Sequence, residues 1–320
     1  MPSVSIIIRC LNEEKHIGRL LSGIMEQTIK DIEIIVVDSG STDATLSVAS
    51  RFPIKIIHIR PQDFSFGYAL NVGCAAATGD VLLFASAHVY PLYKDWVEQI
   101  LAPFKNEKTA LVYGKQRGNE VTKYAEHQVF ATWFPDSSTS NQRHPFCNNA
   151  NCAIRRNLWQ EQAFDETLTG LEDLDWAKKI MEKGWQIAYQ AEATIVHVHE
   201  ERWKNIYNRY RREAIALRAI QQSGGFNFLT FLSLLLRNVW SDYRHALNDG
   251  VLLANLKDIF LFRLMQFWGT YRGYKQSYKA SEELRQRFYY PKDYRPKPAS
   301  DGTEASRKID YTAVHQDDKT

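Results

Sequence analysis

Apolar runs alternate with amphipathic stretches over the first 86 residues of the chain. Runs rich in isoleucine and valine, typical of buried strands, occupy positions 4–8, 31–38, 54–59 and 80–86. Between the first two runs, apolar residues at helical spacing predict a helix with Asn12 as its cap. Strand and helix alternate four times in this way, which predicts an α/β fold with a mostly parallel sheet covered by helices on both faces.

The rest of the chain predicts further elements at less regular spacing. Residues 118–147 read as loop-rich, and a helix is expected over 171–184. Two strands are expected at 185–190 and 193–199, and helices from about 203 onward. We therefore divide the chain into an α/β domain (1–205), a basic amphipathic helical region (206–290) and a polar, Pro-rich tail (291–320) that is expected to be disordered.

The residues just beyond the C-terminal ends of the predicted strands are the first candidates for a binding site, because ligands bind there in such sheets. These residues are 11–14, 38–43, 60–67 and 86–91. Asp38 ends a strand before small hydroxyl residues, which suits recognition of a sugar or base hydroxyl beside a helix N-terminus. A helix cap explains the same pattern. No Gly-x-Gly-x-x-Gly follows the first strand, which argues against a Rossmann dinucleotide site.

Composition narrows the class of protein. The 320 residues are 44 % hydrophobic and carry a formal net charge of +3, which allows a sizeable core and argues against a general polyanion binder. Cysteines at 10, 74, 147 and 152 lack metal-binding spacing and are expected to be buried free thiols in a reducing compartment. There is no signal-peptide pattern and no apolar run of about 20 residues, so we expect a cytoplasmic protein.

Four segments, in this order, resemble the inverting nucleotide-sugar glycosyltransferases of family 2, which have the GT-A fold. They are SIIIRCLNEE, IEIIVVDSGSTDAT, GYALNVGCAAATGDVLLF and GLEDLDWAKKIMEKGW, and the resemblance covers roughly residues 3–205. FDETLTGLEDLDW and IVHVHEERWKNIYNRYRREAIA are more similar to the bacterial polysaccharide branch, which includes rhamnosyltransferases. The resemblance implies transfer of a sugar from a UDP- or dTDP-linked donor to a hydroxyl of a glycan or lipid-linked glycan, in synthesis of bacterial surface polysaccharide.

The same resemblance assigns roles to individual residues. Asp173 would be the base that takes the acceptor proton, Asp38 would contact the nucleoside, and the loop 11–14 would line the base pocket. The residues expected to bind substrate are Cys10, Leu11, Asn12, Glu14, Asp38, Ser39, Gly67, Asn71, Ser86, Asn149, Asn151 and Glu172. The alternatives are that the acids at 172–175 only complement a helix dipole, and that the asparagines only form turns. Trp133, Phe134 and Trp159 fit either a sugar-stacking role or a core role.

Family members usually carry Asp-x-Asp where this chain has Ser86, Ala87 and His88. A departing nucleoside diphosphate still needs a cation. We therefore consider a divalent metal, Mn or Mg, held by His88 with His197 or His199, which share a strand face. In one alternative the three histidines only form hydrogen bonds. In another, basic residues cover the diphosphate, the candidates being Arg60, Arg209, Arg211 and Arg212. Asp80 begins a strand and is expected at the opposite edge.

The C-terminal region is basic and aromatic. From 202 to 290, fifteen lysine and arginine residues stand against six acids. Its long apolar stretches suit either peripheral contact with the inner membrane or packing on the domain or in a homo-oligomer, and no nucleic-acid motif accompanies them. Two rival functions remain open: a catalytically inactive module with this fold that binds nucleotide sugar or glycan, and a nucleotidyltransferase, although the basic Gly-rich loop of the latter is missing after the first strand.

Overall fold

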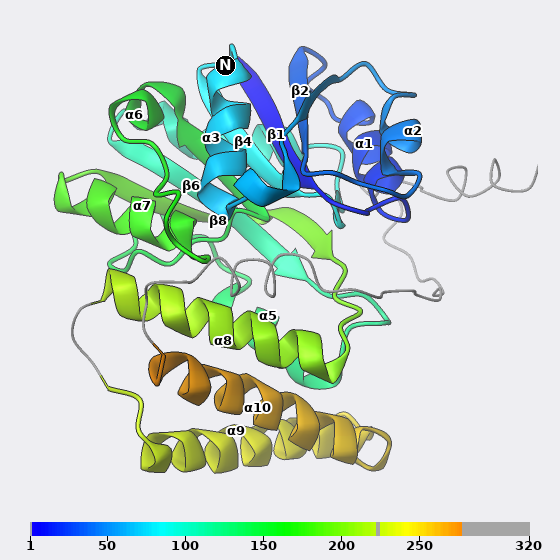
Figure 1. The fold of residues 1–320 in the computed structure, drawn as a ribbon, viewed down its shortest axis with the longest axis vertical. Helices are drawn as coiled ribbons and strands as arrows, with labels where there is room; N and C mark the ends of the chain where they lie inside the picture. The colour runs from blue at the N-terminus through cyan, green and yellow to red at the C-terminus, as the bar shows by residue number, and fades with distance from the viewer. Residues whose placement is uncertain (1, 222–224, 277–320) are drawn as a thin grey trace, which may run out of the picture.

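A mixed eight-stranded sheet forms the centre of the molecule in the computed structural model, which describes residues 2–221 and 225–276 (Figure 1). Its order is β3-β2-β1-β4-β7-β6-β8-β5. The strands are β1 (Val4–Cys10), β2 (Ile32–Asp38), β3 (Lys55–His58), β4 (Val81–Ser86), β5 (Val89–Pro91), β6 (Thr109–Arg117), β7 (Asn151–Arg155) and β8 (Gln186–His197). Strands β1 to β4 are parallel, β7 runs antiparallel between β4 and β6, and β6 pairs in parallel with β8. The predicted mostly parallel, mixed sheet is confirmed.

Two apolar cores cover the two faces of the sheet, because successive side chains of a strand point to opposite sides. Ile6 and Ile8 of β1 pack with α1, α2 and α4, whereas Ile7 packs with α3, α6 and α7. These helices are α1 (Ile17–Met25), α2 (Thr45–Ala49), α3 (Phe66–Ala76), α4 (Trp96–Leu101), α6 (Arg156–Glu161) and α7 (Glu172–Glu182). The four cysteines are buried free thiols, as predicted.

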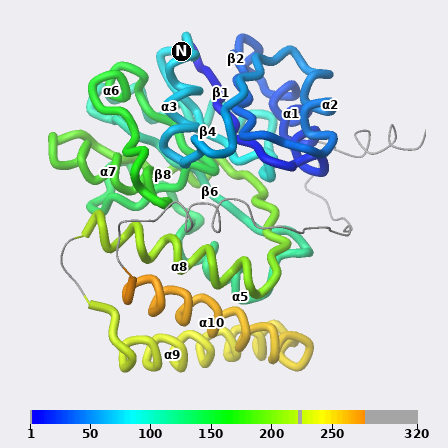
Figure 2. The backbone as a smooth tube through the Cα atoms, viewed as in Figure 1, coloured from blue at the N-terminus to red at the C-terminus, as the bar shows by residue number. Residues whose placement is uncertain are grey.

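The remaining α-helices are stacked at one end of the sheet. They are α5 (Tyr124–Trp133), α8 (Trp203–Ile220), α9 (Phe228–Asn248) and α10 (Leu252–Tyr274). Helix α5 contacts β6, α10 packs on α8, and α9 packs on α10 as the outermost helix (Figures 1 and 2). Glycine lets α10 approach closely, because a Cβ at Gly269 would lie 2.5 Å from the carbonyl oxygen of Tyr207 in α8. Within the described ranges, none of the helices combines the length and apolarity that a membrane crossing requires.

Several predicted boundaries are corrected by the structure. Asn12 is not a helix cap: its φ is +55°, and α1 begins at Ile17, after His16. The strands predicted at 185–190 and 193–199 are one strand, β8, which ends before His199. The stretch 118–147 contains helix α5. The predicted tail, 291–320, and residues 277–290 of the helical region lie outside the described residues.

Candidate active site

The loops after β1 and β2 are tied together at the C-terminal edge of the sheet. Cys10 and Asp38 are register partners at the two strand ends. Asn12 Oδ1 accepts a hydrogen bond from the Thr42 backbone N–H (2.8 Å), and a carboxylate oxygen of Glu14 accepts one from the Ala44 N–H (2.9 Å). The fold therefore brings Cys10, Leu11, Asn12, Glu14, Asp38 and Ser39 into one region, as predicted from their positions at strand ends.

Within this region, the side chain of Asp38 mainly shapes its own loop. It is buried and accepts hydrogen bonds from the backbone N–H groups of Gly40 and Ser41, each at 3.1 Å. His58 Nδ1 lies 3.4 Å from its second oxygen. Ser39 is also buried and donates its hydroxyl to the Cys10 carbonyl. Burial raises the pKa of the Cys10 thiol, which keeps it neutral.

Three residues predicted to bind substrate are engaged by other parts of the protein. The Asn71 amide donates to the Phe164 carbonyl (2.9 Å) and to Glu166 Oε1 (2.8 Å), and its oxygen accepts from Trp159 Nε1 (3.0 Å). Asn151 is fully buried in β7, donates to two carbonyls and accepts from Trp96 Nε1 (2.9 Å). A Cβ at Gly67 would lie 2.4 Å from the Asp165 carbonyl oxygen. These contacts leave little capacity for a ligand.

Asp173 lies in the first turn of α7 and is held by backbone donors. Its Oδ2 accepts from the Asn149 N–H (2.9 Å) and its Oδ1 from the Leu174 N–H (2.8 Å). Burial, and then the neighbouring charge of Glu172, raise the pKa of Asp173 from 3.8 to about 7. A carboxyl group with that pKa is suited to accept a proton near neutral pH.

Arg9 is a site residue that the sequence prediction missed. Its Nη1 lies 3.2 Å from Glu172 Oε1, and its guanidinium group lies 4.7 Å from the centre of the Phe66 ring. Arg212 of α8 lies at the same distance from that ring. Arg9 lies opposite Ser86 of β4 in the sheet, which places it beside the Ser86-Ala87-His88 turn. The signal that could have identified Arg9 in the sequence is a charged residue within an otherwise apolar strand.

The three predicted histidines come together. His88 and His197 rings stack with centroids 5.0 Å apart, and His197 Nε2 lies 2.9 Å from His199 Nε2. One ligand nitrogen from each ring lies within 4.8 Å of those of the other two. The side chains of His197 and His199 do meet. Because His199 follows the end of β8, however, their contact does not come from the predicted shared strand face.

Each of these histidines has an oxygen atom against Nδ1. The partners are Glu13 Oε1 for His88 (2.8 Å), Gln116 Oε1 for His197 (2.8 Å) and Glu126 Oε1 for His199 (2.7 Å). An Nδ1–H that donates to such an acceptor leaves the lone pair of a neutral ring on Nε2. Two Nε2 lone pairs 2.9 Å apart repel unless a cation lies between them. A proton or a divalent metal would relieve this repulsion, so the donor set fits a metal ion, and imidazoles suit manganese or zinc better than magnesium.

A second layer of charge supports His199, and no sequence pattern indicates it. Glu126 of α5 is buried and pairs with Arg209 of α8 at 2.5 Å, and Arg209 also lies 2.6 Å from Glu201. Arg209 is therefore neutralised by two acids. Arg60 pairs with Asp63 on the surface, and Arg211 Nε donates to Gln276 Oε1. Asp80 accepts from Ser3 at the N-terminal edge of the sheet, as predicted.

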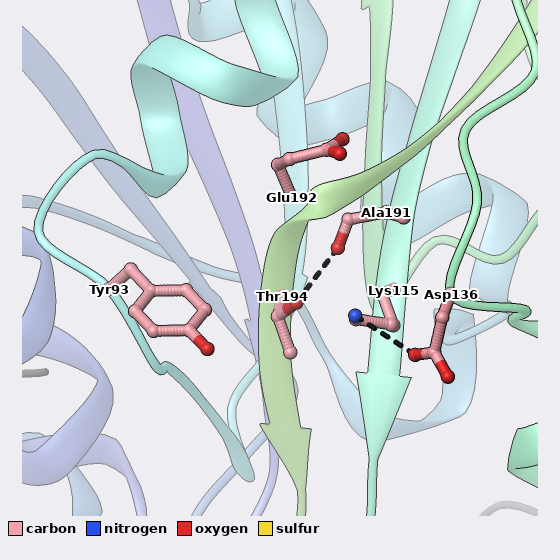
Figure 3. Close-up of a pocket in the computed structure, with 6 residues that line it drawn as sticks. All are labelled: Tyr93, Lys115, Asp136, Ala191, Glu192 and Thr194. Atoms are coloured by element: carbon pink, nitrogen blue, oxygen red, sulfur yellow. Dashed lines mark hydrogen bonds and ion pairs between the residues drawn. The ribbon is translucent and has the colours of Figure 1, made fainter. Parts of the chain in front are cut away.

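The remaining aromatic and pocket candidates lie apart from this cluster. Phe134 belongs to the core, whereas Trp133 is 50 % exposed and stacks on Phe146. A pocket of about 150 Å³ opens where the pairing of β6 with β8 is irregular (Figure 3). It is lined by Tyr93, Lys115, Asp136, Ala191, Glu192 and Thr194, none of which is a predicted site residue.

Comparisons with known proteins give one family match and several similar glycosyltransferases. The model of the glycosyl transferase family 2 matches residues 5–167. The O-antigen chain rhamnosyltransferase WbaN of Salmonella anatum is 28 % identical over 222 residues, which are 66 % of this chain and 70 % of that protein. The corresponding rhamnosyltransferase RfbN of Salmonella typhimurium is 27 % identical over 219 residues, 65 % and 70 % of the two chains.

Among solved structures, a similar one is the mannosyltransferase PcManGT from Pyrobaculum calidifontis in complex with GDP-Man and Mn2+. It matches with a TM-score of 0.58 at 19 % identity and covers 91 % of this chain and 88 % of that one, which supports the GT-A fold. With the family match over half of its length and a buried carboxylate at the sheet edge, the chain belongs to glycosyl transferase family 2 and is a glycosyltransferase.

Proposed function

We propose that the chain is an inverting glycosyltransferase that uses a UDP- or dTDP-linked sugar and extends a glycan or lipid-linked glycan of the bacterial surface. The named O-antigen relatives support a polysaccharide acceptor and a hexose or deoxyhexose donor. Residues 1–205 would form the transferase domain, and the cytoplasm would supply the nucleotide sugar. The observation that carries the proposal is the buried carboxylate of Asp173, held by two backbone N–H groups with its pKa near 7.

The chemical step is a single displacement. An oxygen of Asp173 takes the proton of the acceptor hydroxyl while the hydroxyl oxygen bonds to the anomeric carbon. The bond from that carbon to the diphosphate oxygen breaks on the opposite side, and the electron pair leaves with the nucleoside diphosphate. Because its oxygens are fixed by Asn149 and Leu174, Asp173 needs no rearrangement before it accepts the proton.

The loops after β1 and β2 would hold the nucleoside, with Asp38 fixing the loop that faces it. His88, His197 and His199 would hold a divalent metal, whose charge would stabilise the departing diphosphate. Burial, the other two histidines and Arg209 keep the pKa of His197 well below its usual range, which favours the neutral form that binds metal. Mn2+ in the related mannosyltransferase structure supports this assignment.

The test compares Asp173→Asn with Asp175→Asn. Asp175 is a matched control two residues further along α7, and its carboxylate pairs with Lys179 at 2.6 Å. We expect Asp173→Asn to lower kcat about 10³-fold or more while donor binding, followed by thermal shift, is retained. Asp175→Asn should keep kcat within about threefold, because the Asp175 carboxylate pairs with Lys179 and has no part in the proposed proton transfer.

Loss of folding would not explain the expected result. The pKa of folded Asp173 lies above its unfolded value of 3.8, so the stability of the folded state falls as pH rises from 3.8 to about 7 and stays at the lower value above that. Asp173→Asn removes that charge but places an amide NH2 against the backbone N–H of Asn149 or Leu174, so the two effects oppose each other. We therefore expect a melting temperature within a few degrees of the parent at pH 8. Full transfer by Asp173→Asn would exclude this base, and donor binding without turnover by the parent chain would favour an inactive binding module.

A further inference from the structure

Large apolar side chains are exposed on both helices of the α9–α10 hairpin. Apart from Trp133, every large hydrophobic side chain that is exposed in the described residues lies between 228 and 260. The face includes Leu229, Leu232, Leu236 and Trp240 of α9, and Leu253 and Leu256 of α10. Leu229, Leu236, Trp240 and Leu253 are 75 %, 61 %, 66 % and 90 % exposed. We call this set the outer hairpin face.

The fold does not need this face for its own packing. On the opposite side of α9, Phe231, Leu235 and Val239 are buried against aromatic residues of α10 that include Trp268 and Tyr271. Helix α9 is therefore apolar on two sides and covered on one. A helix with that pattern usually has a partner on its second side as well.

Polar contacts join the two helices of the hairpin to each other and to α5 of the transferase domain. Arg263 of α10 forms a buried bidentate ion pair with Asp242 of α9 (2.7 and 2.9 Å). Tyr124 of α5 donates its hydroxyl to Asp249 (2.6 Å), and His245 Nδ1 lies 2.9 Å from Gln128 Oε1 of α5. The outer hairpin face is thus carried on α5, the helix that also carries Glu126 behind His199.

The exposed charges beside this face are mainly positive. Arg237, Arg244 and Lys257 are exposed beside the apolar side chains. The acids of the hairpin are engaged or partly covered: Asp242 is buried in its ion pair, Asp249 accepts from Tyr124, and Asp258 is half-buried. An apolar stripe flanked by cations, with a tryptophan in it, suits the interface of an anionic bilayer.

We propose that the outer hairpin face docks on the surface of a membrane that contains anionic phospholipid, with the helices lying in the interface. A second copy fits less well, because a two-fold interface on this face would bring the cations of both copies, Arg237 and Arg244 among them, into one interface. The idea deepens the proposed function and rests on it for the acceptor: a docked hairpin would hold the transferase domain at the surface where a lipid-linked glycan resides.

The experiment measures flotation of the full chain with vesicles, without donor or acceptor. Vesicles of phosphatidylcholine with about 30 % phosphatidylglycerol are compared with pure phosphatidylcholine. We expect at least about tenfold stronger binding to the anionic vesicles, weakened by salt. The double variants Leu236→Gln/Trp240→Gln and Arg237→Gln/Arg244→Gln should each weaken binding to anionic vesicles about tenfold or more. The matched control Leu236→Met/Trp240→Phe keeps the apolar character and should bind like the parent.

Melting temperatures of the variants should equal that of the parent, since the substituted side chains face solvent. Parent chain that stays unbound from anionic vesicles overturns the proposal, and so does a Leu236→Gln/Trp240→Gln variant that binds as the parent does. A stable dimer that this variant dissociates would show a second copy on the face and would also overturn it. Transfer to a soluble acceptor in lipid-free buffer tests the proposed function separately, so the two failures are distinguishable.

Discussion

Asp173 is a carboxylate whose surroundings work against its own charge. Burial and the neighbouring Glu172 raise its pKa from 3.8 to about 7. As the base must be unprotonated to act, we expect kcat to be low at acidic pH, to rise through about pH 7 and to level above it. Measurement of kcat at saturating substrate between about pH 5 and 9 checks this rise.

Arg9 opposes this effect through its ion pair with Glu172 at 3.2 Å. Its positive charge lowers the pKa of Asp173, so Arg9→Gln should raise that pKa and move the rise of kcat to higher pH. Arg19→Gln is the control, because Arg19 lies over Tyr90 on the other side of β1. This substitution should leave the pH at which kcat rises unchanged. If kcat of Arg9→Gln rises at the same pH as kcat of the parent, the assignment of this rise to Asp173 is contradicted.

At the residue scale, the sequence predicts where polar groups lie more reliably than what they contact. Residues after strand ends do meet, since parallel strands end at one edge of a sheet. The roles of Asn71 and Asn151 could not be read in advance, because their partners come from segments as distant as residues 164 and 193. Glu126 likewise becomes a partner of His199 only after folding.

At the scale of elements, the close contact of α10 with α8 depends on glycine. A Cβ at Gly269 would lie 2.5 Å from the Tyr207 carbonyl oxygen and 3.2 Å from the Arg211 nitrogen, both backbone atoms that yield poorly. Overpacking costs about 1–3 kcal/mol and outweighs the gain of about 1 kcal/mol in helix propensity. We expect Gly269→Ala to lower the free energy of unfolding in urea by about 1–2 kcal/mol.

Gly225→Ala is the matched control, because a Cβ there would have no heavy atom within 4 Å. It should leave the free energy of unfolding within about 0.5 kcal/mol of the parent. A stability gain in Gly269→Ala would mean that propensity dominates and that the two helices are not in tight contact.

The elements that the sequence did not predict share a physical reason. β5 is three residues long, and β7 is set by pairing with β4 and β6 on either side. Helix α5 lies in a loop-rich stretch, and its buried positions include Glu126, whose charge masks the amphipathic pattern. The first four strands are long apolar runs and carry their own signal, whereas these elements are defined by tertiary contacts.

At the scale of the whole molecule, folding is what assembles the histidine cluster. His88 follows β4, His197 ends β8, and the partners Glu13, Gln116 and Glu126 come from three other segments. In the unfolded chain these groups are far apart. A metal bound by the cluster would therefore stabilise the folded chain by mass action.

We expect Mn2+ to raise the melting temperature of the EDTA-treated chain, corresponding to about 2.7 kcal/mol at a concentration of 100 times Kd. His197→Ala should abolish this shift, because it removes a nitrogen that lies 2.9 Å from another ligand. His144→Ala is the control, since His144 is exposed and outside the cluster, and its shift should equal that of the parent. An equal Mn2+ shift in the parent and His197→Ala would place any bound metal elsewhere. With no shift in the parent, the two facing nitrogens would be joined by a proton, and basic residues would have to neutralise the leaving diphosphate.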